Sequence, residues 1–262
     1  MEFEISNRDQ ALFLASGRDL EAQLLAIKGA LRRNQEADEA VSESIRQLDN
    51  HISDYSGEDE LYEMHLQDER VDALHNSAFQ DAAHSMAAVG MLAPFVESLF
   101  VAIFAGLHKR GGKCGATVTD ERSEAAETEF WDPHFVLGRG GRRVDLVAGI
   151  KQLSASVGLS SYLPAGYEQS LTALFAYRNK MFHHGFEWPL DERLKFEERI
   201  RTEGWPTIWF SKSTSGDHPW IFYMSTPFID QCLAMIDAVL EGVGKYLGQQ
   251  RPVPPAEGWP DC

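Results

Sequence analysis

The sequence has little cysteine and little positive charge, and each shortage excludes a class of protein. Its 262 residues include three cysteines, Cys114, Cys232 and Cys262. They are too few for a disulfide framework and lack the spacing of a metal site. Forty Asp and Glu against 24 Lys and Arg give a formal net charge of −16. That charge argues against broad non-specific binding to nucleic acid, although a local basic cleft or a basic partner protein stays compatible with it.

A secretory signal and a second long apolar run are also missing. The N-terminus has no basic region followed by an apolar stretch, so we expect a cytoplasmic protein. Residues 86–107 are the most apolar in the chain, but Pro94 and Glu97 interrupt them. We therefore expect a buried central helix and no membrane span. Glu97 then needs a buried cation, for which Arg178 is the first candidate, or a small solvated cleft.

Proline is absent from residues 8–50, where apolar residues recur at helical spacing. They are Leu20, Leu24, Ile27, Leu31, Val41, Ile45, Leu48 and Ile52. Asn34 and Asp38 fill the two intervening positions, so either the helix breaks in two or these residues set the register of a coiled-coil-like pair. With an acidic turn over residues 53–63, the pattern predicts an N-terminal helical hairpin or dimerisation arm. A helix along the molecule's own core is the alternative.

The later part of the chain predicts a short β-hairpin and a closing helix. Strand-forming residues occupy 205–211 and 219–225 around a polar turn. We expect their aromatic side chains, Trp209, Phe210, Trp220, Phe222 and Tyr223, to cover a helical core rather than to stack on bases. Thr226 and Pro227 form a helix start, with Thr226 as the cap. The predicted fold is mainly α, a helical bundle with this β-hairpin inserted before the last helix.

Residues 176–189 carry polar side chains where a packed helix should be apolar. One buried face is predicted from Leu171, Leu174, Phe175, Met181 and Phe182. Arg178 falls within that stripe and needs a carboxylate partner or a cleft. Asn179 and His183 share a face because they are four apart, and Arg178 can reach the same end. Gly185 should end the helix, which puts His183 and His184 in its last turn.

The stretch Arg178-Asn179-x-x-x-His183 resembles the Arg-x(4–6)-His motif of HEPN (higher eukaryote and prokaryote nucleotide-binding) domains. Glu97 in the earlier apolar helix is also similar to the family arrangement, and the resemblance covers about residues 75–190. It implies an endoribonuclease that needs no metal or other cofactor and shares its site across a homodimer. His183, or alternatively His184, would transfer protons, Arg178 would stabilise charge, and Asn179 would position the phosphate or the histidine. Such enzymes often act as toxins or in anti-phage defence, which implies a cognate antitoxin or defence-system partner.

Two basic clusters, residues 108–113 and 138–143, are candidate RNA contacts because glycine lets backbone N–H groups approach phosphates. The candidates are Lys109, Arg110, Lys113, Arg139, Arg142 and Arg143, with Lys180 in the motif helix. The alternative is two flexible loops that stay soluble through their charge.

The organisation expected from these segments has four parts. They are a helical arm (1–64), a HEPN-like core with a loop insertion at about 110–143 (65–190), a helix, β-hairpin and closing helix packed on the core (191–250), and a disordered tail (251–262). The competing function is a non-catalytic nucleotide-binding or assembly module.

Overall fold

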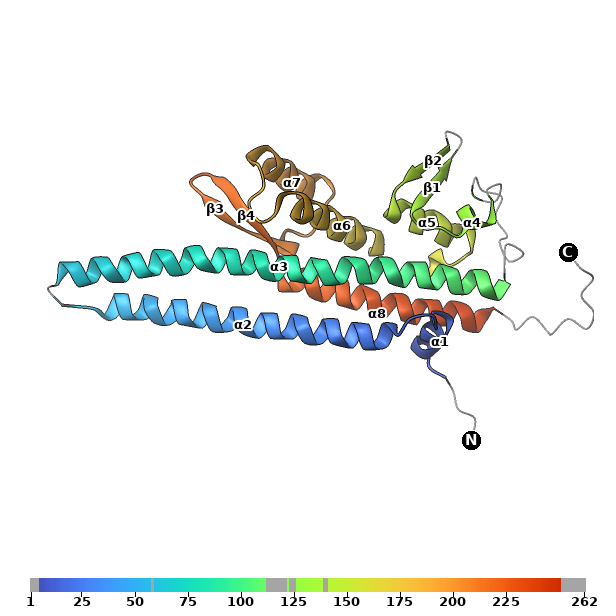
Figure 1. Cartoon of the computed structure of the whole chain (residues 1–262), viewed down its shortest axis with the longest axis horizontal. Helices are drawn as coiled ribbons and strands as arrows, with labels where there is room; N and C mark the ends of the chain where they lie inside the picture. Colours follow the sequence, from blue (N-terminus) through green and yellow to red (C-terminus); the bar gives the residue numbers. More distant parts are fainter. Residues whose placement is uncertain (1–4, 58, 112–121, 123–125, 139–140, 251–262) are drawn as a thin grey trace, which may run out of the picture. The chain divides into compact units, whose positions relative to one another are not determined.

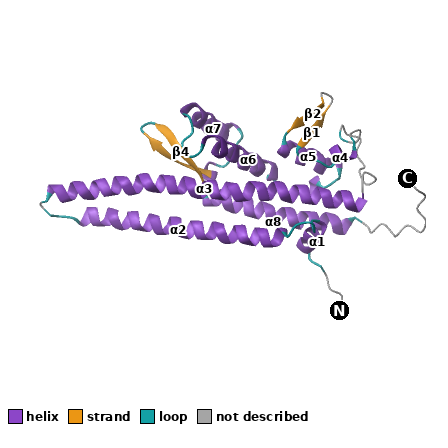
Figure 2. Cartoon of the chain, viewed as in Figure 1, coloured by secondary structure: helices purple, strands orange, loops and turns teal. Residues whose placement is uncertain are grey.

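The computed structural model describes residues 5–57, 59–111, 122, 126–138 and 141–250. Within these ranges the chain forms eight α-helices and two two-stranded antiparallel sheets (Figure 1). Figure 2 shows that helix dominates the described residues, in which the strands form two hairpins. The predicted mainly α fold, with a small β-hairpin before the last helix, is confirmed.

The chain divides into two compact units that interleave along the sequence. Unit 1 comprises Met1–Leu20, Glu97–Glu168 and Ala234–Cys262, and unit 2 comprises Glu21–Val96 and Gln169–Leu233. One boundary follows the first residue of the helix that begins at Leu20, and the other three fall inside α3 (Glu60–Gly111), α6 (Tyr167–His184) and α8 (Thr226–Gln249). The consecutive division into 1–64, 65–190, 191–250 and 251–262 stays a prediction, and its tail lies outside the described residues.

Unit 2 contains the N-terminal helical hairpin, formed by α2 (Leu20–Asp54) and the first part of α3 (Figure 1). The helix α2 continues through Asn34 and Asp38, so a break into two helices is wrong. Asp38 instead forms a side-chain hydrogen bond with His84 of α3. Asp49 pairs with Arg70 further along the same two helices. These polar pairs fix which residues face each other, as expected of a register-setting position.

The core of unit 2 is a cluster of aromatic rings around Phe196 of α7 (Leu190–Thr202). The rings come from α6, α7, the loops on either side of α7, and the hairpin of β3 (Phe210–Ser215) and β4 (His218–Met224), which pair in antiparallel register. Phe196 lies 5.1–6.1 Å from the ring centres of Tyr177, Trp188, Trp205, Phe210 and Phe222. Trp209, Phe210 and Phe222 are buried, which confirms that the hairpin covers a core through these rings.

The last helix, α8, includes Thr226 and begins immediately after Ser225. The side-chain oxygen of Ser225 accepts a hydrogen bond from the backbone N–H of Phe228 at 3.3 Å. The predicted helix start is therefore confirmed, but Ser225 rather than Thr226 caps the first turn, because its side chain lies one residue ahead of the helical backbone.

In unit 1 the short helix α1 (Asn7–Leu14) packs against the later part of α8. Arg8 forms an ion pair with Asp237 at 2.7 Å, and the Asn7 side-chain amide donates to Glu241 at 2.7 Å. At Gly244, an added Cβ would lie 1.9 Å from the backbone oxygen of Asn7. Glycine at this position is thus what lets the two helices approach so closely.

Unit 1 also contains a second hairpin that the sequence did not predict. Within the expected loop insertion lie α4 (Glu127–Phe130), β1 (Phe135–Gly138) and β2 (Gly141–Val144), before α5 (Leu146–Ser156). The strands escaped prediction because they are four residues long and β2 is exposed throughout, so no alternation marks them. Buried Arg122 donates to the backbone oxygens of Phe130 and Asp132, which ties this segment together.

In the described part of the chain, α3 is long and apolar enough to cross a membrane by length and composition alone. Its most apolar 18-residue window has a mean hydropathy of 2.0, and 56% of that window is buried. The core helix of a soluble protein meets the same criterion, in keeping with the central helix expected from residues 86–107. Val89, Leu92, Val96 and Leu99 are fully buried.

Candidate functional site

The candidate site lies at the C-terminal end of α6, in unit 2, where the helix is anchored by one face only. Leu171, Leu174 and Met181 are buried as predicted, and the Tyr177 hydroxyl donates to the backbone oxygen of Phe222 at 2.9 Å. Successive helical residues turn by about 100°, so Arg178 falls at the edge of a face centred near Tyr177. Arg178 is accordingly half-buried, at the border between core and solvent.

The predicted burial of Phe182 is wrong, because 58% of this residue is exposed. It occupies the same edge of α6 as Arg178, whose guanidinium carbon lies 5.7 Å from the centre of the Phe182 ring. Arg178 Nη1 also donates to Asn179 Oδ1 at 3.2 Å. Arg178, Asn179 and Phe182 thus form one partly exposed group on the final turns of the helix.

Both histidines of the motif are exposed in the last turn of α6, as the sequence predicted. Their ring centres are 6.5 Å apart. Gly185 follows with a φ of +71°, and its N–H donates to the backbone oxygen of Met181 at 2.9 Å, which ends the helix. Because His183 is four residues after Asn179, the structure brings this histidine and the amide to the same side of α6.

Lys180 was expected to contact RNA, but its ammonium forms an ion pair with Glu192 of α7. Lys195 contacts the same carboxylate at 2.8 Å. Hydrogen bonds from Lys180 and Lys195 lower the pKa of Glu192 to about 2. Lys180 therefore braces α6 against α7, and its role as an RNA contact stays a prediction.

Glu97 and Arg178 belong to different units, and each has a contact of its own. Glu97 Oε1 lies 3.1 Å from His134 Nε2 in unit 1, whereas Arg178 contacts Asn179 and Phe182 in unit 2. The ion pair proposed between Glu97 and Arg178 stays a prediction.

The remaining basic candidates lie in unit 1, and two of them are already paired. Arg142 lies 3.2 Å from Glu129 and over the ring of Phe135, and Arg143 lies 3.1 Å from Asp145. Lys109 and Arg110 are exposed at the end of α3. Lys113 and Arg139 lie outside the described residues. The cluster around β2 thus has less charge available for phosphate than its sequence suggested.

Unit 1 contains a cluster of Asp132, His134 and Glu97 that was not predicted from the sequence. His134 Nδ1 lies 2.7 Å from Asp132 Oδ1, and its other ring nitrogen faces Glu97. Burial alone would lower the pKa of His134, but the hydrogen bonds and negative charge of Asp132 and Glu97 outweigh it and raise the pKa above its ordinary value of 6.5. The sequence signal that could have indicated this cluster is the spacing of Asp132 and His134, which are two residues apart in a polar turn.

We expect the contribution of His134 to stability to fall as the pH rises. A raised folded-state pKa means that the contribution is fully present below about pH 6.5 and lost above the folded pKa. Replacing His134 by glutamine should therefore lower the melting temperature more at pH 5 than at pH 9. The loss in melting temperature at pH 5 should exceed the loss at pH 9 by about 1–2 °C, because the cluster is partly exposed. A pH-independent effect of the His134→Gln substitution would contradict the assignment.

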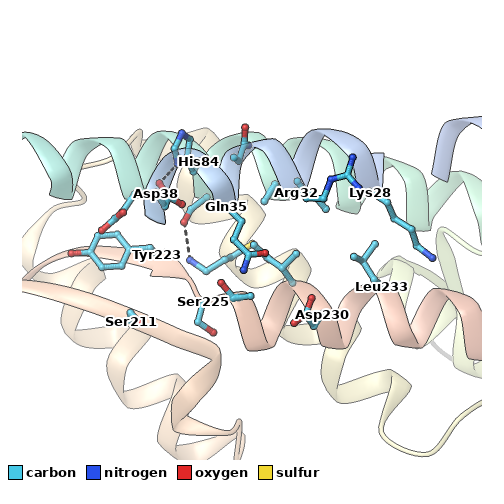
Figure 3. A pocket seen from close by; sticks show the side chains of 18 residues that line it. Lys28, Arg32, Gln35, Asp38, His84, Ser211, Tyr223, Ser225, Asp230 and Leu233 are labelled. Carbon is cyan, nitrogen blue, oxygen red and sulfur yellow. Dashed lines mark hydrogen bonds and ion pairs between the residues drawn. The ribbon is translucent and has the colours of Figure 1, made fainter. Parts of the chain in front are cut away.

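Unit 2 also contains an open pocket of about 380 Å³ between α2, α3, β4 and α8 (Figure 3). Lys28, Arg32, Gln35 and Asp38 line it from α2, with Ser225 and Asp230 at the start of α8. Burial, followed by the negative charge of Asp38, raises the pKa of Asp81 in its wall. The pocket presents both signs of charge, and His84 lies in contact with Asp38 there.

The end of α6 has groups suited to acid–base chemistry on a phosphate ester. It offers two exposed imidazoles, a guanidinium and an amide within two helical turns. Imidazoles can transfer protons near neutral pH, and a guanidinium can stabilise developing negative charge. Within the described ranges, no group of three or more His, Cys, Asp or Glu side chains is placed to hold a metal ion.

Comparisons with protein families, with curated proteins and with solved structures found no match to this chain. The resemblance to HEPN domains therefore rests on the motif and its position at the end of α6.

Proposed function

We propose that this chain is a metal-independent endoribonuclease of HEPN type, acting at a site shared between two copies. The observation that carries the proposal is the group of half-buried Arg178 with exposed Asn179 and His183 on the final turns of α6. An arginine sealed beneath apolar side chains would favour a purely structural role. Arg178 is half-buried and oriented toward exposed neighbours, so its charge can reach a ligand.

The proposed reaction is attack of a ribose 2′-oxygen on the adjacent phosphorus. His183 takes the 2′-hydroxyl proton as the new P–O2′ bond forms, and a second imidazole gives a proton to the departing 5′-oxygen as the P–O5′ bond breaks. Arg178 stabilises the extra negative charge on the phosphorane-like transition state, and Asn179 positions the phosphate or the histidine. The products are a 2′,3′-cyclic phosphate and a 5′-hydroxyl.

A second copy of the chain supplies a second His183 for the other proton transfer. One histidine cannot readily serve both proton transfers at once, whereas a symmetric dimer brings two equivalent residues to one site. Phe182, exposed beside Arg178, gives this end of the helix an apolar side chain that a second copy would cover. His184 on the same turn is the alternative proton carrier.

The competing proposal is a non-catalytic nucleotide-binding or assembly module. The net charge of −16 supports it, since an acidic protein attracts RNA poorly. Under either proposal we expect a cytoplasmic location. A role as a toxin or in anti-phage defence, with a cognate antitoxin or defence-system partner, is proposed from the resemblance to HEPN domains alone.

The test is cleavage of labelled total RNA in excess EDTA, which suppresses metal-dependent contaminating nucleases. Wild type should cut the RNA and leave 2′,3′-cyclic phosphate ends. The Arg178→Ala/His183→Ala variant should lose this activity, and His65→Ala should keep it because His65 is exposed on α3, outside the motif. Folded, dimeric wild type that cuts no RNA would favour the binding module.

The oligomeric state gives a separate check of the shared site. Sedimentation at micromolar concentration should show a dimer under the conditions in which RNA is cut. A fully active monomer would contradict the two-copy arrangement while leaving the chemistry of His183 in place.

A further inference from the structure

The outer part of the α2–α3 hairpin, residues 36–75, contributes −11 to the formal net charge of −16 of the protein. We call it the acidic arm. It contains thirteen acidic side chains and two basic ones, Arg46 and Arg70. Both of these arginines are already paired, with Glu43 and Asp49. The arm is therefore a strongly negative surface within unit 2, and any partner that binds it must accommodate that charge.

An apolar stripe runs along the α3 side of the arm. Leu61, Met64 and Val71 are 74%, 57% and 61% exposed. Their spacing of three and seven residues places them on one face of the helix. Leu74 is also exposed, one turn further on. Isolated exposed apolar residues are common, but a row of them along one helix face marks a binding surface.

The stripe continues the seam that the rest of unit 2 covers. The same three- and four-residue spacing leads to Ala78, Ala82 and Ser85, all of which are buried. At Ser85 the covering element is β4, because the backbone N–H of Met224 donates to the Ser85 hydroxyl at 2.9 Å. The exposed apolar residues of the arm therefore lie on the same face of α3 that is buried in the rest of unit 2, beyond the elements that cover this face.

The other helix of the arm leaves its seam incompletely buried as well. Val41, Ile45 and Leu48 of α2 are half-buried, although they occupy the predicted seam positions. Two helices alone leave part of their shared seam open, and a third helix laid along them would close it.

We propose that the acidic arm binds a basic amphipathic helix of another protein. Such a helix would place its apolar residues against Leu61, Met64 and Val71 and its lysines and arginines beside the arm's carboxylates. A second copy of this chain is the wrong occupant, because two acidic arms would repel one another. Nucleic acid is disfavoured for the same reason. The inference does not depend on ribonuclease activity.

The probe is a labelled synthetic peptide of about four heptads, with leucine at the a and d positions and lysine at most others. A scrambled peptide of the same composition controls for charge alone. Fluorescence anisotropy should show that the patterned peptide binds the full chain at least about tenfold more tightly than the scrambled one. Binding should weaken between about 0.05 and 0.5 M salt, because the flanking contacts are ionic.

The variant Leu61→Ser/Met64→Ser/Val71→Ser should weaken binding of the patterned peptide by on the order of 100-fold. The matched control is Phe13→Ser/Leu25→Ser/Ile208→Ser, which removes three comparably exposed apolar residues elsewhere and should bind as wild type does. All six positions are exposed, so circular dichroism should be unchanged in both variants.

Three results would overturn the proposal. These are equal binding by the arm variant and wild type, equal binding of the patterned and scrambled peptides, or no binding of the patterned peptide. Self-association of wild type that disappears in the arm variant would identify a second copy as the occupant instead. RNA cleavage is measured separately in the same variants, so failure of one proposal does not count against the other.

Discussion

Replacing His183 by alanine is expected to reduce metal-independent RNA cleavage by on the order of 100- to 10,000-fold. Loss of the imidazole removes the group proposed to take the 2′-hydroxyl proton, and in a symmetric dimer both copies lose it. The fold should be unaffected because His183 is exposed in the last turn of α6 and Gly185 ends the helix without it. Single-turnover cleavage of a labelled RNA in EDTA measures the effect.

The neighbouring His184→Ala variant is the matched control, because it removes the same side chain one residue later. We expect it to retain most of the activity, since His183 rather than His184 shares a helix face with Asn179. Full activity in His183→Ala together with loss in His184→Ala would show that the wrong histidine was chosen. Circular dichroism of both variants should match wild type.

Replacing Phe196 by alanine is expected to destabilise unit 2 by about 3–5 kcal/mol, because it opens a cavity among packed rings. Phe196 is 1% exposed and lies between five aromatic side chains from α6, the loops on either side of α7 and the β3–β4 hairpin. Trp188 and Trp205 are two of these neighbours, so their fluorescence during urea unfolding reports directly on the region.

Phe13→Ala removes the same side chain from an exposed position of α1 and should change the free energy of unfolding little. A cost below about 1 kcal/mol for Phe196→Ala would mean that the aromatic cluster is not the packed core of unit 2. Because α6 packs on this cluster through Tyr177, RNA cleavage by Phe196→Ala should also fall at temperatures where wild type stays folded.

Much of the fold was accessible from local sequence patterns. The long helices followed from apolar spacing, the β3–β4 hairpin from strand-forming residues around a turn, and the end of α6 from Gly185. These features depend on residues a few positions apart, so the sequence contains the information directly. The short β1–β2 hairpin was missed because its exposed residues carry no such pattern.

The candidate site could likewise be predicted from the sequence only in part. The common face of Asn179 and His183 is a property of helical periodicity, and the structure adds that both are exposed. The predicted burial of Phe182 was wrong, because the centre of the buried face depends on what packs against α6 and lies near Tyr177. Lys180 likewise found its carboxylate only once α7 lay beside α6.

The sequence by itself therefore determined the helical elements, the position of the motif on the last turns of one helix and the concentration of acid in the arm. The tertiary structure decided which side chains meet. His84 reaches Asp38, and Glu97 reaches His134, across 46 and 37 residues of chain. Periodicity fixes spacing within an element, but the partner of each charge depends on how separate elements pack, because burial without a partner is costly.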